Sequence, residues 1–335
     1  MNSISKQSSA GPITGAQSKA VLKSTSLGSR FADRFFTGIA AVCAVSVLAI
    51  VVLIAYELYA SSTLSLHQFG LKFFYSQNWD PVAGDFGALP FIYGTLVSSF
   101  LALALAVPVS LAAAVFITEM SPGWLKTPLS FLMELLAAIP SVIYGLWAIF
   151  ILAPLLRKYV QPFLANYFGW TGLFSGPPFG IGMLAAGIVL AIMIVPIVCS
   201  ISRDVMSAVP QNQREAVLAL GATRWEMIRT GVLRNARAGI VGGIILGLGR
   251  ALGETMAVTM VIGNRPEISK SLFAPGYTMA SVIANEFSEA TDNLYLSAII
   301  EIGLALFLVT LIVNAIARGL IWMTTRGMPA RAHGQ

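Results

Sequence analysis

Two oppositely charged side chains inside an apolar stretch are the residues best placed to do chemistry. Arg250 and Glu254 lie four residues apart in the segment 239–262, which is otherwise almost entirely apolar or small. Side chains at this spacing are neighbours on one face of a helix and can form an ion pair. Arg250 stands about 16 Å along such a helix, near the middle of a hydrocarbon core about 30 Å thick. A charge there costs at least about 2.5–3.5 kcal/mol, so we expect the pair to face the interior of a helix bundle or water.

The pair has two interpretations that the residues alone leave open. In the first, Arg250 and Glu254 form a structural ion pair that holds helices in register. In the second, Arg250 is a cation lining an anion pathway, and Glu254 either positions it or yields it to the substrate. Four other polar side chains in apolar segments are candidate partners on such a path: Glu134, Glu301, Thr255 and Tyr144.

The remaining reactive residue types exclude several kinds of site. Two cysteines and two histidines are too few for a disulfide framework or a metal cluster. A phosphate-binding loop needs a lysine that follows a glycine, and none of the seven lysines does so. We therefore expect no catalytic residues, no bound cofactor or metal, and no ATP hydrolysis by that route in this chain.

Composition indicates an all-α membrane protein. The chain has 56% hydrophobic and only 11% charged residues, whereas soluble domains carry roughly a quarter charged residues. About 20 apolar residues span a bilayer as a helix. Six segments meet this condition: 35–59, 91–116, 129–153, 179–200, 239–262 and 296–321. Pro108, Pro140 and Pro196 fall inside three of these segments, where we expect kinks.

The distribution of lysine and arginine predicts the orientation in the membrane. With the amino terminus inside, the inner segments hold 15 of these residues and the outer segments hold five. Positive residues concentrate on the cytoplasmic side, so both termini are predicted to be cytoplasmic. The Ser- and Gly-rich residues 1–34 are predicted to be a disordered tail, residues 35–325 the transmembrane domain, and residues 326–335 a second tail.

The long outer segments contain aromatic residues that suit the membrane interface. Trp79, Trp170 and Tyr277 lie in the segments 60–90, 154–178 and 263–295. Tryptophan and tyrosine are enriched at headgroup level, so we expect interfacial packing there. A docking surface for an external protein is the alternative.

Glycines in the fifth segment predict close helix packing. Gly239, Gly243 and Gly247 recur every fourth residue, and Gly249 with Gly253 repeats this spacing on another face. Small residues at such intervals let membrane helices approach closely. We therefore expect this helix to be central in the bundle.

The hydrophilic segment 203–237, which we call the elbow, has the signals of a structured loop. It holds six arginines and three acidic residues. Pro210 can begin a helix that ends at Leu220, and Gly221 suits the left-handed residue that follows a helix. Thr223 and Glu226 form a capping box, which predicts a second helix to about Leu233. A structured, charged loop between two membrane helices implies a partner.

Three sequence blocks resemble one family of transporters. The block Glu215-Ala216-x-x-x-x-Gly221 resembles the EAA loop of binding-protein-dependent ABC importers, and the blocks 242–258 and 138–147 resemble its phosphate-specific branch. The similarity covers nearly all of residues 35–325. Two departures occur: Val217 replaces an alanine, and Gly231 to Arg234 replaces the pattern Ile-x-Leu-Pro. The missing proline at 234 allows the second elbow helix to extend into the fifth span.

The resemblance implies a fold and a set of partners. The fold is that of a type I importer permease with a coupling helix pair. The partners are a sister permease of the PstA type, two ATPase copies of the PstB type that bind ATP and Mg, and an extracytoplasmic phosphate-binding protein of the PstS type. The resemblance also implies that the chain lies in the lipid bilayer of a bacterial inner membrane. No nucleic acid is expected as a partner. The elbow residues that would contact the ATPase are Glu215, Ala216, Leu220, Gly221, Trp225 and Glu226.

Other functions remain as alternatives. An ABC permease for another oxyanion would share the same pattern. A secondary transporter with Glu254 or Glu134 as a proton site would need no ATPase, and the elbow would then have no purpose. A membrane enzyme is disfavoured because no nucleophile and base are paired in the sequence.

Overall fold

The computed structural model describes residues 27–325 of the 335-residue chain. Residues 1–26 of the predicted amino-terminal tail and all of the predicted carboxy-terminal tail, 326–335, lie outside the described residues, so these predictions stay open. Residues 27–34 belong to the predicted disordered tail but form the start of a helix. The chain divides into two units at Glu57 and Leu58, and each is described by itself.

The described residues form helices and one short hairpin. The α-helices are α2 (Leu27–Ser61), α3 (Thr63–Phe69), α4 (Leu89–Val115), α5 (Gly123–Ala138), α6 (Ser141–Trp147), α7 (Ala153–Leu155), α8 (Gln161–Phe168), α9 (Met183–Ser207), α10 (Gln211–Ala219), α11 (Arg224–Glu226), α12 (Arg234–Leu252), α13 (Met256–Val261), α14 (Met279–Glu286) and α15 (Asn293–Thr325). Short 3₁₀ or π-helical segments are η1 (Gly70–Phe74), η2 (Phe116–Met120), η3 (Ala148–Leu152), η4 (Leu156–Val160), η5 (Gly169–Thr171) and η6 (Met227–Leu233).

Six helices are long and apolar enough to cross a membrane, as the composition predicts. They span 34–61, 89–120, 141–171, 183–207, 224–252 and 293–319. In the first unit, α2 is apolar around its whole circumference, and every side chain from Arg34 to Ile54 is exposed. A helix of this length with an apolar surface on all sides is suited to hydrocarbon surroundings.

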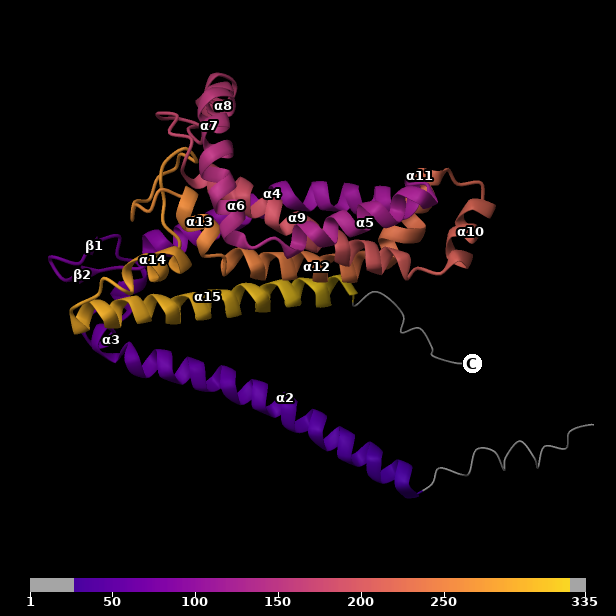
Figure 1. Cartoon of the computed structure of the whole chain (residues 1–335), viewed down its shortest axis with the longest axis horizontal. Helices are drawn as coiled ribbons and strands as arrows, with labels where there is room; N and C mark the ends of the chain where they lie inside the picture. The colour runs from indigo at the N-terminus through magenta and orange to yellow at the C-terminus, as the bar shows by residue number, and fades with distance from the viewer. Residues whose placement is uncertain (1–26, 326–335) are drawn as a thin grey trace, which may run out of the picture. The chain divides into compact units, whose positions relative to one another are not determined.

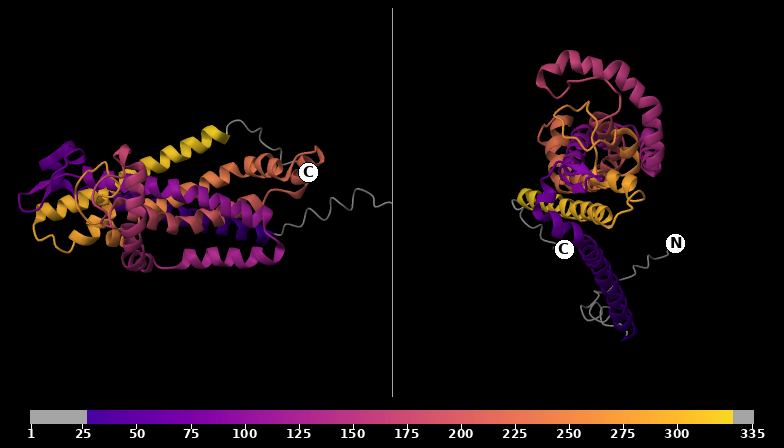
Figure 2. Two further views of the ribbon diagram at one scale, coloured as in Figure 1. Left: turned by 90° about the horizontal axis from the view of Figure 1, so that it is seen from above. Right: turned by 90° about the vertical axis from the view of Figure 1, so that its left-hand side faces the viewer.

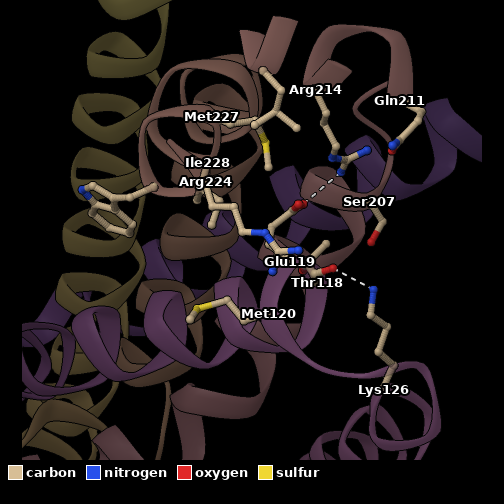
Figure 3. A pocket seen from close by; sticks show the side chains of 12 residues that line it. Thr118, Glu119, Met120, Lys126, Ser207, Gln211, Arg214, Arg224, Met227 and Ile228 are labelled. Atoms are coloured by element: carbon tan, nitrogen blue, oxygen red, sulfur yellow. Dashed lines mark hydrogen bonds and ion pairs between the residues drawn. The ribbon is translucent and has the colours of Figure 1, made fainter. Parts of the chain in front are cut away.

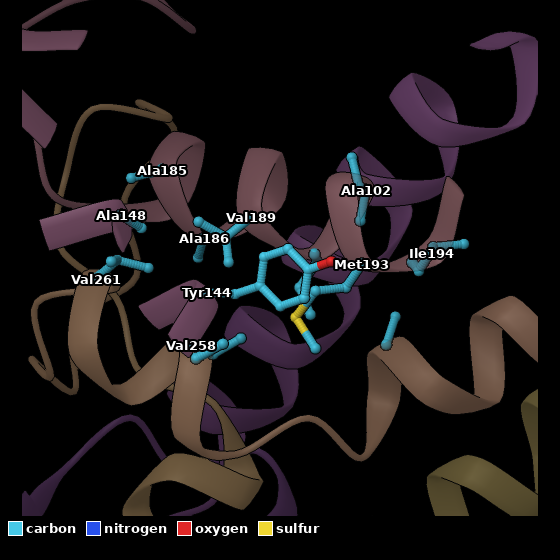
Figure 4. Packing of buried hydrophobic residues seen from close by; sticks show 14 of the residues in the cluster. Ala102, Tyr144, Ala148, Ala185, Ala186, Val189, Met193, Ile194, Val258 and Val261 are labelled. Atoms are coloured by element: carbon cyan, nitrogen blue, oxygen red, sulfur yellow. The ribbon is translucent and has the colours of Figure 1, made fainter. Parts of the chain in front are cut away.

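The second unit is built around α9. In Figures 1 and 2, α4, α9 and α12 run alongside one another, and α15 lies beside α12. Alanine, valine and leucine side chains of α9 form the main core cluster with residues of α4, α6 and α13 (Figure 4). Because 15 of the 25 residues of α9 are buried, this helix fixes the positions of its neighbours.

The glycines of α12 explain how α12 approaches α9. A Cβ at Gly239 would lie 2.5 Å from Val205, and one at Gly247 would lie 2.7 Å from Ile194. Neither distance can accommodate a methyl group without movement of a neighbour. The second expected packing face is not found within the described chain, since a Cβ at Gly249 would meet nothing within 4 Å.

The bounds predicted for the third span, 129–153, are wrong. Helix α5 ends at Ala138, Pro140 separates it from α6, and the membrane-length helix runs from Ser141 to Thr171. Ile139 is extended (φ −66°, ψ 128°), the conformation that a following proline favours. Pro108 and Pro196 lie inside α4 and α9 without ending either helix. The predicted loop 154–178 is therefore largely helical.

The expected fifth span also differs from the structure. The second elbow helix does not stop at Leu233 but continues through η6 and α12 to Leu252, so the chain is helical from Arg224 to Leu252. Arg234, which occupies the place of a proline, allows this continuity because it keeps the backbone N–H. The helix then breaks at residues 253–255, inside the segment 239–262 that we expected to be continuous.

Aromatic side chains form a core at one end of the second unit. This end lies opposite to the elbow, and we call it the far end. Strands β1 (Trp79–Asp80) and β2 (Asp85–Phe86) form an antiparallel hairpin with Trp79 opposite Phe86. Trp79 packs edge-on against Phe86 and Phe91, with ring centroids 4.9 Å apart in each case. Its indole N–H donates to Glu286 Oε2 at 2.8 Å. Tyr277 is therefore a buried core residue and Trp79 is partly buried against this core, whereas Trp170 is 85% exposed.

Candidate functional site

The Arg250–Glu254 pair lies at the break between α12 and α13. Arg250 occupies the last turn of α12, and residues 253–255 separate the two helices. Arg250 Nη2 lies 3.9 Å from Glu254 Oε2, which is a loose ion pair. The expected position of Arg250 in mid-helix is wrong, because the helix ends two residues later. A cation in the last turn is stabilised by the partial negative charge of the helix carboxyl end.

The two side chains of the pair have different surroundings. The Glu254 side chain is only 7% exposed, and Oε1 accepts a hydrogen bond from the backbone N–H of Ala257 at 3.3 Å. The Arg250 side chain is 43% exposed. Glu254 is thus held in place by the first turn of α13, while the guanidinium of Arg250 keeps donors that can bind a second anion.

The other predicted path residues are only partly brought together. Thr255 lies in the same break and its hydroxyl donates weakly to Gly253 O at 3.4 Å. Tyr144 is buried on α6, which packs on α13, and its hydroxyl donates to Leu136 O at 2.8 Å. This bond joins α6 to α5 across Pro140.

Glu134 and Glu301 are not partners of Arg250. Glu134 is 61% exposed and pairs with Arg203 of α9 at 3.4 Å. Glu301 is fully buried on α15, beside Ser65 rather than Arg250.

The elbow has the local structure that its sequence predicts. Gly221 has a left-handed backbone (φ +83°) directly after α10 and Leu220. Thr223 Oγ1 accepts from the backbone N–H of Glu226 at 3.3 Å, and Glu226 Oε2 accepts from the backbone N–H of Thr223 at 2.8 Å. This reciprocal capping box begins α11.

The outer face of the elbow exposes apolar and polar side chains together. Leu220 is 89% exposed and Trp225 is 61% exposed. Glu215 and Ala216 of α10 and Glu226 of α11 are exposed as well. The predicted coupling residues therefore lie on one exposed helix pair.

Comparison with known proteins identifies the family. Residues 106–321 match the family described as the binding-protein-dependent transport system inner membrane component. This chain is 47% identical to the phosphate transport system permease protein PstC of Mesorhizobium japonicum over 86% of this chain and 90% of that protein. The PstC protein of Pasteurella multocida is 51% identical over 77% of this chain and 81% of that protein. The PstC protein of Xylella fastidiosa (strain Temecula1) is 46% identical over 88% and 92%.

The chain belongs to this family of transport permeases.

A solved structure shares the permease fold. The chain resembles a structure of the MetNI methionine ABC transporter in inward-facing conformations, with a TM-score of 0.52 over 70% of this chain and 95% of that one. The sequence identity is 17%, so the likeness concerns the fold alone. The six apolar helices and the family together make the permease a multi-pass inner-membrane protein.

Sequence reasoning missed an ion pair of the permease that joins the elbow to the end of an apolar helix. Glu119 of η2 and Arg214 of α10 are 3.0 Å apart (Oε1 to Nη2) and their side chains are 7% and 14% exposed (Figure 3). The pair lines a cavity of about 690 Å³, to which α5, α9, α10, α11 and η6 also contribute side chains. One signal was present: Glu119 is an acidic residue at the end of an apolar span, next to no basic residue in sequence. Its partner lies 95 residues away.

Proposed function

We propose that this permease is one subunit of an ATP-driven importer that carries inorganic phosphate across the inner membrane. The observation that carries the proposal is the identity of 46–51% to three phosphate transport permeases over 77–88% of this chain. The family description supports delivery of the substrate by a separate binding protein.

The elbow is proposed as the contact with a separate ATPase. Its exposed Leu220 and Trp225 support this role, because a water-exposed apolar pair on a capped, structured turn is suited to a protein partner. The excess of lysine and arginine in the elbow and the terminal segments supports a cytoplasmic position for all three. ATP and Mg would then bind to the ATPase, and a sister permease would complete the pathway.

Arg250 is proposed as the cation that the substrate meets at the break between α12 and α13. A guanidinium presents donors in a fork that matches two oxygens of a phosphate. Glu254 is already held by the backbone N–H of Ala257, so its carboxylate is kept beside Arg250 without needing all of the arginine donors. Thr255, at the same break, supplies a hydroxyl. Tyr144 supports the site by joining α6 to α5 through its hydrogen bond to Leu136 O.

Purification of the tagged chain from its native membrane in mild detergent tests the proposal. We expect an ATPase and a second permease to co-purify, and ATP hydrolysis to rise when a phosphate-loaded binding protein is added. Uptake of phosphate and of sulfate into proteoliposomes then identifies the anion. A stimulated complex that prefers sulfate would move the assignment to another oxyanion. A homo-oligomer without ATPase would overturn the importer, and proton-coupled uptake would become the explanation to test.

A further inference from the structure

Arg214 connects α10 to two helices of the bundle at once. Its Nη2 atom donates to Glu119 Oε1 at 3.0 Å and to the backbone oxygen of Met206 at 2.9 Å. Its Nη1 atom donates to the backbone oxygen of Val209 at 2.5 Å. Glu119 ends the helix that begins with α4, and Met206 lies in the last turn of α9. One side chain of α10 therefore contacts the ends of both α4 and α9.

The burial of this pair sets it apart from the other ion pairs near the elbow. Glu119 and Arg214 are 7% and 14% exposed, whereas Asp204, which pairs with Arg203 at 3.0 Å, is 66% exposed. A buried pair that loses one partner leaves an uncompensated charge away from water, so the pair strongly resists separation. An exposed pair is screened by water and holds its partners weakly.

Arg214 makes the polar connection between α10 and these two helices. A cavity of about 690 Å³ lies beside the pair, so part of this interface has no packed side chains to transmit a displacement (Figure 3). Helix α10 has other contacts: Asn235 Nδ2 donates to Gln213 Oε1 at 3.1 Å, and Val217 faces Gly231. Val217 also packs against an apolar cluster that includes Ala114 of α4 and Met206 of α9. Of the side-chain hydrogen bonds of α10, those of Arg214 reach the ends of α4 and α9, and that of Gln213 reaches α12.

We infer that Arg214, with its partner Glu119, transmits movement of α10 to the ends of α4 and α9. Arg214 is a positioning residue: its neighbours Glu215 and Ala216 lie on the exposed face that would meet a partner, while its own side chain points into the bundle. Displacement of α10 then moves the ends of α4 and α9 with it, because the three guanidinium contacts fix both distance and angle. This inference rests on the proposed function, since it requires an ATPase that moves the elbow.

The test compares transport with ATP hydrolysis in the complete complex. Complexes of the full chain with its sister permease and ATPase are reconstituted in proteoliposomes with the binding protein, and phosphate imported per ATP hydrolysed is measured. For Arg214→Gln and Glu119→Gln we expect this ratio to fall about fivefold or more, the usual range of a coupling between two sites. ATP hydrolysis per complex should persist. The control Asp204→Asn removes an exposed pair at the same end and should leave the ratio unchanged.

A normal ratio in either Gln variant would overturn the inference and leave the proposed function intact. If Arg214→Gln does not assemble, Arg214→Lys is measured instead. Lysine keeps the charge but lacks the fork that reaches all three acceptors, so an intermediate ratio is expected and a normal one would overturn the inference. A merely structural role would lower the amount of complex without changing the ratio. A wild-type complex that imports no phosphate would overturn both the proposed function and this inference.

Discussion

At the scale of single residues, the break after α12 gives Arg250 and Glu254 unequal freedom. Glu254 is buried and hydrogen-bonded to the start of α13, whereas Arg250 is nearly half exposed and only loosely paired at 3.9 Å. A structural ion pair is best served by two buried, closely spaced partners. The observed asymmetry favours the interpretation in which Arg250 can bind an incoming anion.

The first prediction concerns Arg250→Gln. Loss of a charge-assisted contact to the substrate should weaken phosphate uptake by about tenfold or more, because hydrogen bonds to charged groups contribute about 1.5–3 kcal/mol. The complex should still assemble, as judged by co-purification. Arg318→Gln, which replaces an exposed arginine near the end of α15, is the matched control and should transport normally. Failure of Arg250→Gln to assemble would favour the structural ion pair.

The second prediction concerns Gly221, whose left-handed backbone ends the first elbow helix. No atom lies within 4 Å of a Cβ built there, so the restriction is conformational and not steric crowding. Gly221→Val should strain the turn by about 1–2 kcal/mol, and less ATPase should be retained during purification. Gly221→Asn is the control, because asparagine tolerates the left-handed region better. Equal ATPase retention in both variants would contradict this explanation.

At the scale of helices, contacts between α12 and α9 depend on glycines facing branched side chains. Gly239 faces Val205 and Gly247 faces Ile194 and Val198, so α12 lies against α9 at backbone distance. Gly242 lies on another side of α12 and has no neighbour within 4 Å of a Cβ. The two glycines on one helix therefore separate the effect of packing from that of helix propensity.

The third prediction compares Gly247→Ala with Gly242→Ala. The new methyl group at 247 would lie 2.7 Å from Ile194 and 2.9 Å from Val198. We expect a destabilisation of about 1–3 kcal/mol from overpacking, measured by thermal unfolding in detergent. At 242 alanine has free space and a helix propensity about 1 kcal/mol better than glycine. A lower melting temperature for Gly242→Ala than for Gly247→Ala would refute the assigned packing faces.

At the scale of the whole molecule, the elbow and the β-hairpin lie at opposite ends of the second unit (Figure 1). The long helices α4, α9 and α12 connect the two ends. If the unit crosses the membrane as proposed, then the elbow and the far-end aromatic core face different compartments.

The fourth prediction is therefore one of sidedness. Leu220→Cys in the elbow and Val82→Cys in the hairpin are 89% and 98% exposed positions. In a background with Cys43 and Cys199 replaced, a membrane-impermeant maleimide should label Val82→Cys in intact spheroplasts. Leu220→Cys should react only after the membrane is permeabilised. The reverse labelling would place the elbow outside and exclude contact with a cytoplasmic ATPase.

The membrane class, the number of long apolar helices and the turn structure of the elbow were predictable from the sequence alone. Each of these depends on residues close in the chain. Helix length follows from a run of apolar residues, the Thr223–Glu226 capping box spans three positions, and the turn at Gly221 needs a single residue without a Cβ.

The break at 253–255, the packing of Trp79 against the far-end core and the Glu119–Arg214 pair became apparent from the folded chain. Trp79 could equally have faced headgroups, since an aromatic residue suits both places; its bond to Glu286 spans 207 positions. Glu119 and Arg214 are 95 positions apart. The sequence around an apolar or charged residue is the same whether its side chain meets lipid, water or another helix. Which of these surroundings the side chain meets depends on how distant segments of the chain pack. The pattern of neighbouring residues in the sequence does not contain this information.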